Sequence, residues 1–184
     1  AHFGKWHNIE TEDAVTAYLE YENGSTGVFV TTTGEAPGTN RLEVAAERGR
    51  VVIENGKITF TRNVVSMSEF SRTTTGCFSR PETWSIDIPV NGNGGQHNEI
   101  LQNFTDCILD GKELIAPAVE GIHSVELGNA MILSSLLDKT ITLPIDAEQY
   151  EGELQKLIDS SKFQTKTAAG VAADFSTSFV KAPT

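Results

Sequence analysis

The chain has 184 residues, of which 39% are hydrophobic, and its 25 acidic and 14 basic side chains give a formal net charge of −11. This length fits one domain with a short appendage. The acidic balance and the lack of a Lys/Arg cluster exclude a nucleic-acid-binding function, and no apolar stretch approaches the ~20 residues of a membrane span.

Short strands joined by tight turns are predicted for the first third of the chain. Asn23-Gly24 and Asn55-Gly56 are strong hairpin signals, because both central positions of such a turn take a positive φ. The period-two alternation of apolar residues predicts an antiparallel meander with one covered face and one free face. The strands are expected at residues 14–21, 27–33, 41–46, 51–54 and 57–61.

Residues 63–82 are polar, rich in Ser and Thr, and show no periodicity, which is typical of a functional loop or of a partly disordered one. A strand is expected again at residues 84–90. The glycine-rich segment 91–95 that follows is not a dinucleotide fingerprint, because His97 stands where G-x-G-x-x-G requires glycine and no βαβ unit surrounds it.

Three helices are predicted for the rest of the domain. The first, at residues 96–109, ends at the glycine stop Asp110-Gly111, and the second, at 119–137, is apolar nearly all round and is expected between two layers. Asp146 and Gln149 resemble a capping box for a third helix that ends near Ile158. This order predicts an α+β domain over residues 1–160, an open, mostly antiparallel β-sheet with α-helices packed on one face.

Residues 161–184 form a Thr/Ala/Ser-rich segment, expected to be a disordered tail or an arm that docks on a neighbour. The two cysteines are too few for a disulfide framework. Cys107 falls on an apolar helical face, where a buried free thiol is expected, and Cys77 falls in the polar stretch, where an exposed thiol is expected. We therefore expect a reducing, cytoplasmic location.

Metal and nucleophile signatures are weak. Glu120 and His123 have the spacing used in di-iron bundles, but no second copy of that motif occurs. His7 stands close to Glu10, Glu12 and Asp13 in a polar cluster that could be solvated, line a substrate pocket or, least favoured, bind a metal. Spacing alone therefore predicts a fold class and no reaction.

Several segments resemble the C-terminal domain of the Gfo/Idh/MocA oxidoreductases, the family of glucose–fructose oxidoreductase and inositol dehydrogenase. Residues 8–27 resemble its first hairpin, and residues 33–44 followed by 47–49 are similar to its next strands. Residues 97–104, together with 120–121 and the helix at 125–137, are similar to its later part. The resemblance implies a two-domain enzyme in which an N-terminal Rossmann domain holds NAD or NADP. The C-terminal sheet would then carry helices on one face and homo-oligomer contacts on the other, and the substrate would be a sugar or polyol.

Catalytic residues of that family are not found in this chain. The family's catalytic Lys lies in a Glu-Lys-Pro motif of the nucleotide domain, and its acid–base Asp and His lie in a helix that would precede Ala1. Hydride transfer needs a positioned cofactor and an acid–base group. We therefore expect no catalytic, cofactor-binding or metal-binding residue here, and no activity of the chain alone.

Part of a substrate wall is expected to remain, formed by His7, Arg72, Arg80 and Trp84 in or beside strand-edge loops. An indole face stacks on the C–H surface of a sugar, and an Arg fork binds hydroxyls or carboxylates. The alternative for Trp84 is a core or subunit-interface position, and the alternative for the two arginines is plain solvent exposure.

Two other function classes stay open on the residues alone. The first is a non-enzymatic α+β interaction module that self-associates through its open sheet face, and the second is a secreted sugar-binding domain. A sheet with helices on one side must hide its other face or keep that face polar. Under either leading hypothesis we expect a homo-oligomer, a dimer or a tetramer, formed through that face.

Overall fold

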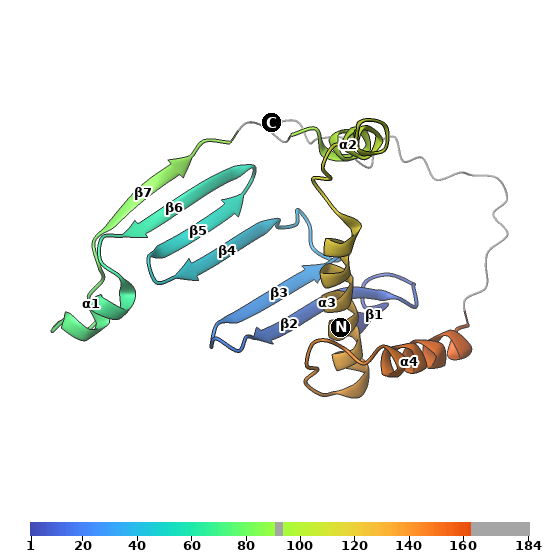
Figure 1. Cartoon of the computed structure of the whole chain (residues 1–184). Coiled ribbons are helices and arrows are strands. Elements are labelled where there is room, and N and C mark those ends of the chain that lie inside the picture. Colours follow the sequence, from blue (N-terminus) through green and yellow to red (C-terminus); the bar gives the residue numbers. More distant parts are fainter. Residues whose placement is uncertain (91–93, 163–184) are drawn as a thin grey trace. The chain divides into compact units, whose positions relative to one another are not determined.

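The computed structural model describes residues 1–90 and 94–162 of the chain (Figure 1). These residues divide into two compact units: unit 1 comprises Ala1–Thr31 and the chain from Gly128 on, and unit 2 comprises Thr32–Leu127. Nearly all of the predicted tail, and residues 91–93 of the predicted glycine-rich connection, lie outside the described residues.

Unit 1 is built around a small antiparallel sheet of order β1-β2-β3. The strands are β1 (His2–Phe3), β2 (Glu12–Glu20) and β3 (Thr26–Thr32). The hairpin predicted at Asn23-Gly24 is confirmed, since Gly24 has a φ of 81° and its N–H donates to the carbonyl of Tyr21 at 2.8 Å. β1 was not predicted, because two residues are too few to show an alternation.

The core of unit 1 comes from β2 and from α3 (Ala118–Leu137), which begins in unit 2 and ends in unit 1. Ala14 and Val15 are buried on the strand, and Ala130 and Leu133 are buried on the helix. The expectation that this helix is buried between two layers is wrong for its first half, where Val119, Ile122 and Val125 are exposed. The two residues buried on this helix both lie in the half that belongs to unit 1.

The last helix, α4 (Ala147–Ser160), also belongs to unit 1. Its predicted cap is confirmed, because the carboxylate of Asp146 accepts the N–H of Gln149 at 3.1 Å. At its other end, Glu10 accepts hydrogen bonds from the hydroxyl of Ser161 and, at 2.9 Å, from the N–H of Lys162.

Unit 2 contains a four-stranded antiparallel meander of order β4-β5-β6-β7 (Figure 1). The strands are β4 (Arg41–Ala46), β5 (Gly49–Glu54), β6 (Lys57–Asn63) and β7 (Thr83–Ile88). The predicted turn at Asn55-Gly56 is confirmed, with φ values of 52° and 70°. The open, mostly antiparallel α+β class is confirmed as well, with the strands divided between two sheets.

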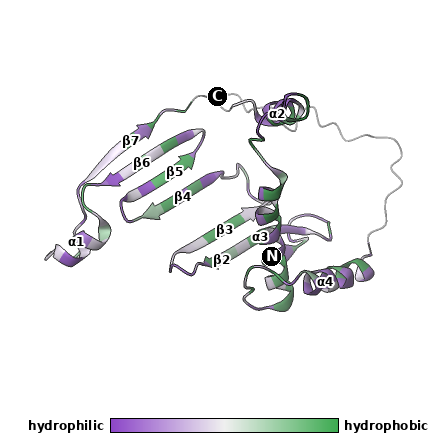
Figure 2. Ribbon diagram, viewed as in Figure 1, coloured by the Kyte–Doolittle hydropathy of each residue, from purple (hydrophilic) through white to green (hydrophobic). Residues whose placement is uncertain are grey.

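The register gives this sheet two chemically different faces, because residues directly opposite in neighbouring strands point the same way. Aliphatic residues and one tryptophan dominate the face that we call the apolar face, and charged residues dominate the opposite, polar face. Hydrophobic and hydrophilic residues accordingly follow one another along these strands (Figure 2). The apolar face comprises Leu42, Val44, Ala46, Gly49, Val51, Ile53, Ile58, Phe60, Arg62, Trp84, Ile86 and Ile88. The polar face includes Arg41, Glu43, Arg50, Glu54, Lys57 and Asp87.

Ion pairs link the charged side chains of the polar face within β4 and between β4 and β5. Arg41 contacts Glu43 at 2.5 Å and Glu54 at 2.8 Å, and Arg50 contacts Glu43 at 3.5 Å. The hydrogen bond from Arg41 is the main reason that the pKa of Glu43 lies below its ordinary value. Because all of these side chains are substantially exposed, the pairs suit a face that stays in water rather than one that adds much stability.

A short helix, α1 (Met67–Thr73), stands where residues 63–82 were expected to form a loop, so that expectation is wrong for this segment. Ser66 caps it by accepting the N–H of Glu69 at 3.3 Å. The turn before β5 anchors it as well, since Glu47 accepts the N–H groups of Met67 and Ser68, each at 2.9 Å.

The predicted helix before Gly111 is confirmed as α2 (Gln96–Asp110), with Gly111 at a φ of 68° ending it. Asn103 then fixes the following segment, donating to the carbonyl of Glu113 and accepting the N–H of Ile115. As for membranes, the described helices include none with the length and apolar character that a crossing would need.

Candidate functional site

The predicted site residue His7 lies in the loop between β1 and β2 of unit 1, which is organised by Asp13. The carboxylate of Asp13 is only 4% exposed and accepts three backbone N–H groups, from Lys5 at 2.9 Å, Trp6 at 2.6 Å and His7 at 2.9 Å. Asp13 therefore acts as the anchor of this loop, which leaves the side chains of Trp6 and His7 exposed.

The acidic residues near His7 hold backbone segments in place. Besides Asp13, Glu10 is bonded to the chain that follows α4, and Glu12 lies near enough to Tyr150 to add to the rise in its pKa that burial causes. Among residues 1–90 and 94–162, no group of three or more His, Cys, Asp or Glu side chains is placed to hold a metal ion. The substrate-pocket interpretation of His7 remains a prediction.

Burial alone would raise the pKa of Asp13, but the hydrogen bonds from Trp6, His7 and Lys5, together with nearby His7, lower it by more. The pKa therefore lies below its ordinary value. Because the folded pKa is below the unfolded one, the ionised carboxylate favours the folded loop at neutral pH, and that contribution is lost as the pH falls below the ordinary value and then through the folded pKa.

Protonation of Asp13 in acid should therefore detach the loop of Lys5, Trp6 and His7 from this carboxylate. A substitution that removes the carboxylate should detach the loop at every pH. We expect the amide NMR shifts of Lys5, Trp6 and His7 to move together once the pH falls below about 3.8, the ordinary value for Asp13. In Asp13→Asn one carboxylate oxygen is replaced by an NH2 group that cannot accept a hydrogen bond. The three amides should therefore show, already at neutral pH, the chemical shifts that the wild-type chain shows only in acid. Amides that keep their wild-type shifts in this variant would contradict the anchoring role.

The other three predicted site residues, Arg72, Arg80 and Trp84, belong to unit 2. Arg72 lies in the last turn of α1. Its charge contributes to holding the pKa of Glu47 below its ordinary value, after the larger effect of hydrogen bonds from Ser68. Arg72 is thus exposed beside an acidic neighbour.

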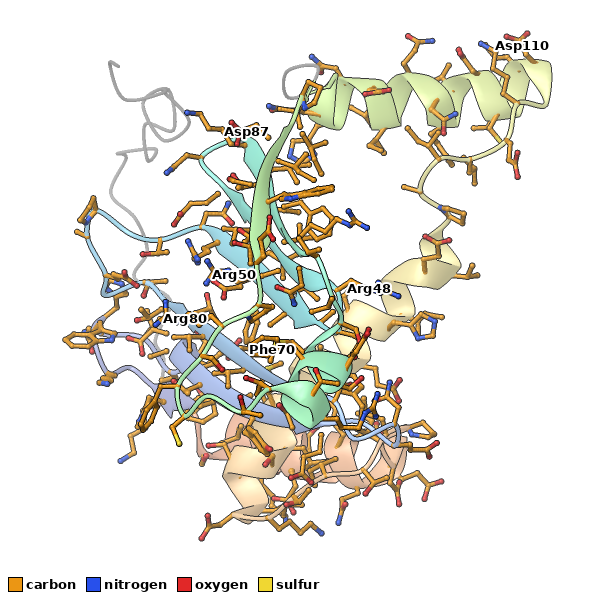
Figure 3. All side chains as sticks on the ribbon, turned by 90° about the vertical axis from the view of Figure 1, so that its left-hand side faces the viewer. Arg48, Arg50, Phe70, Arg80, Asp87 and Asp110 are labelled. Carbon is orange, nitrogen blue, oxygen red and sulfur yellow. The ribbon has the colours of Figure 1, made fainter. Side chains whose placement is uncertain are left out.

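Trp84 and Arg80 lie at the same end of the four-stranded sheet but do not converge. Trp84 is the register partner of Arg62 on the apolar face, and its side chain is 52% exposed. Arg80 lies in the loop before β7, on the same side of the sheet as Arg50 of the polar face (Figure 3). The structure therefore places these two predicted site residues on opposite sides of the sheet.

Trp84 instead pairs with Arg62, which we did not predict as a site residue. The guanidinium carbon of Arg62 lies over the indole, 5.1 Å from the ring centroid. The alternation of β6 could have revealed it, because Arg62 follows Ile58 and Phe60 in the same phase of the strand. An arginine at a position where the alternation of a strand predicts an apolar residue is a signal for a candidate functional residue.

The chain was compared with known proteins. Its residues 1–143 match a family model described as "Oxidoreductase family, C-terminal alpha/beta domain". The matched range contains every strand found among the described residues, together with α1, α2 and α3, whereas α4 follows it. No curated protein matches the chain.

Proposed function

Because the chain belongs to the Gfo/Idh/MocA oxidoreductase family, as its C-terminal α/β domain, we propose that it is the substrate-binding and oligomerisation domain of an NAD(P)-dependent sugar or polyol dehydrogenase. The observation that carries the proposal is the family match over 143 of 184 residues, on a chain with open antiparallel sheets. This match also favours the enzyme hypothesis over a free-standing interaction module. The candidate substrate residues stay His7, Arg72, Arg80 and Trp84, and a cytoplasmic location stays our expectation.

The chain alone should not turn over substrate. Its 184 residues contain neither a dinucleotide fingerprint nor a Glu-Lys-Pro motif, and hydride transfer requires both a held cofactor and an acid–base group. We expect no reduction of NAD or NADP, followed by nicotinamide absorbance, with a panel of sugars and polyols. The same assay on the full polypeptide encoded by the gene should show turnover.

Two results would overturn this proposal. Turnover by the chain alone, at or near the rate of the full polypeptide, would show that the catalytic groups lie within these 184 residues. Turnover by neither preparation with any sugar or polyol would remove the proposed substrate class. A circular dichroism spectrum with the expected strand and helix content is the control that each preparation is folded.

We also propose that the domain forms a homo-oligomer through the purely aliphatic and aromatic part of the apolar face of the four-stranded sheet, which includes Leu42 and Val44 and leaves Arg62 and Trp84 outside the contact. Contiguous apolar surface of this kind is typical of interaction sites, and Val44 is 53% exposed there. A chain with a net charge of −11 repels its own copies, yet the apolar face carries no acidic residue. Two copies can therefore meet there without bringing carboxylates together.

A further inference from the structure

The register arranges the apolar face in three rows, each made of four paired residues, one from every strand of the sheet. One of these rows differs from the other two. The other two rows contain only apolar side chains: Leu42, Ile53, Ile58 and Ile88 in one, and Val44, Val51, Phe60 and Ile86 in the other. The row nearest α1 consists of Ala46, Gly49, Arg62 and Trp84. The face therefore ends in two small residues beside a cation and an indole.

Arg62 and Trp84 are the two residues of this row with large side chains. The guanidinium lies over the ring at 5.1 Å from the centroid, a contact that restrains both side chains. An arginine that lies over an aromatic ring can still offer N–H groups of its guanidinium to a carboxylate in a forked bond. Trp84 remains half-exposed and offers the rest of its apolar surface to a ligand.

Ala46 and Gly49 are the two residues of this row with little or no side chain. Gly49 cannot gain a side chain, because a Cβ there would lie 2.1 Å from the carbonyl oxygen of Thr61. Beside it, the exposed Arg48 occupies the turn between β4 and β5, on the side of the sheet opposite to Arg50 in Figure 3. Arg50 belongs to the polar face, so Arg48 lies on the side of Arg62 and Trp84.

The arginines of the chain divide by their partners. Arg41 and Arg50 are paired with Glu43 on the polar face, and Arg72 acts on Glu47. Arg48, Arg62 and Arg80 are within ion-pair distance of no carboxylate in the described part of the chain. Of these three, Arg80 lies on the side of Arg50 in Figure 3. The acidic residues close in sequence do not neutralise these arginines. Glu47 accepts a hydrogen bond from Ser68, and Glu82 is exposed and makes no ion pair with a described residue.

We propose that Arg48, Arg62 and Trp84 form a subsite for a sugar acid, so that the substrate carries a carboxylate rather than being a neutral sugar or polyol. This inference rests on the proposed function, whose substrate class it narrows. The two guanidiniums bind the carboxylate, and the indole stacks on the C–H surface of the sugar ring. In a chain with a net charge of −11, an anion is repelled from most of the surface and attracted here.

The test uses the fluorescence of Trp84 in the whole chain carrying Trp6→Phe, which leaves Trp84 as its one tryptophan. D-glucuronate, D-glucose and acetate are titrated separately. We expect glucuronate to bind with a dissociation constant of the order of 1 mM, and glucose and acetate to bind at least about tenfold more weakly. Arg62→Gln should weaken glucuronate binding about tenfold and leave glucose unchanged, and Arg62→Lys should recover only part of the loss.

Arg50→Gln is the matched control, since it removes an arginine from the other face of the same sheet and should leave glucuronate binding unchanged. Equal binding of glucose and glucuronate would overturn the subsite while leaving the proposed sugar or polyol function intact. Acetate that binds as tightly as glucuronate would show an adventitious ion only. Binding of neither sugar would also overturn the subsite, and the turnover assay on the full polypeptide then decides the proposed function separately.

Discussion

Gly49→Ala should destabilise unit 2 by about 3 kcal/mol, because both its backbone conformation and its surroundings reject a side chain. Gly49 has a φ of 137°, which L-residues with a Cβ rarely adopt. The new Cβ would lie 2.1 Å from the carbonyl oxygen of Thr61 and 3.0 Å from the Cα of Arg62. Both atoms are backbone, so no side-chain rotation relieves the clash and the pairing of β5 with β6 must shift.

Gly56→Ala separates the clash from the conformational cost. Gly56 also has a positive φ, of 70°, but no atom lies within 4 Å of a Cβ built there. Its substitution should cost only about 1 kcal/mol, the usual penalty for a non-glycine residue in this region. Urea unfolding followed by Trp84 fluorescence in the Trp6→Phe background reports on unit 2, and equal losses for the two variants would contradict the proposed clash.

The parts of unit 2 that local chemistry determines were predictable from the sequence. β4 has the predicted bounds because Leu42, Val44 and Ala46 alternate with polar residues and loop residues precede them. The turn at Asn55-Gly56 and the stop at Gly111 follow from the tolerance of these residues for positive φ. These features depend on neighbours only a few residues away.

The missed features depend on contacts between distant segments. α1 has only seven residues and few strong helix formers, and it is held by Glu47, about twenty positions earlier in the chain. Its local signal, Ser66 with Glu69, is a capping box that could have been recognised. The division of the strands into two sheets depends on the path of the chain after β3, which no alternation encodes.

The candidate site shows the same limit. The alternation of β7 predicts that Trp84 shares a face with Ile86 and Ile88, and this is confirmed by the register. The pairing of β6 with β7 then decides that Arg62, rather than Arg80, lies beside the indole. Likewise, the role of Asp13 as a loop anchor requires three amides to point at one carboxylate, which residue types alone do not reveal.

Val44→Asp should convert the homo-oligomer into a monomer. In an isologous contact each copy supplies the same patch, so a single substitution places two carboxylates in the apolar contact. A charge buried there without a partner should raise the dissociation constant at least thirtyfold, the equivalent of ~2 kcal/mol. Sedimentation of the wild-type chain and of the variant above about 1 µM measures this shift directly.

Ala45→Asp is the matched control, because Ala45 is the next residue of the same strand, points to the polar face and pairs across with Arg50. It adds the same charge and should leave the assembly unchanged. Val44 is half-exposed on an edge strand, so Val44→Asp should keep the far-ultraviolet spectrum of the folded chain. A wild-type chain that stays monomeric, or two variants that dissociate equally, would exclude the apolar face as the contact between copies.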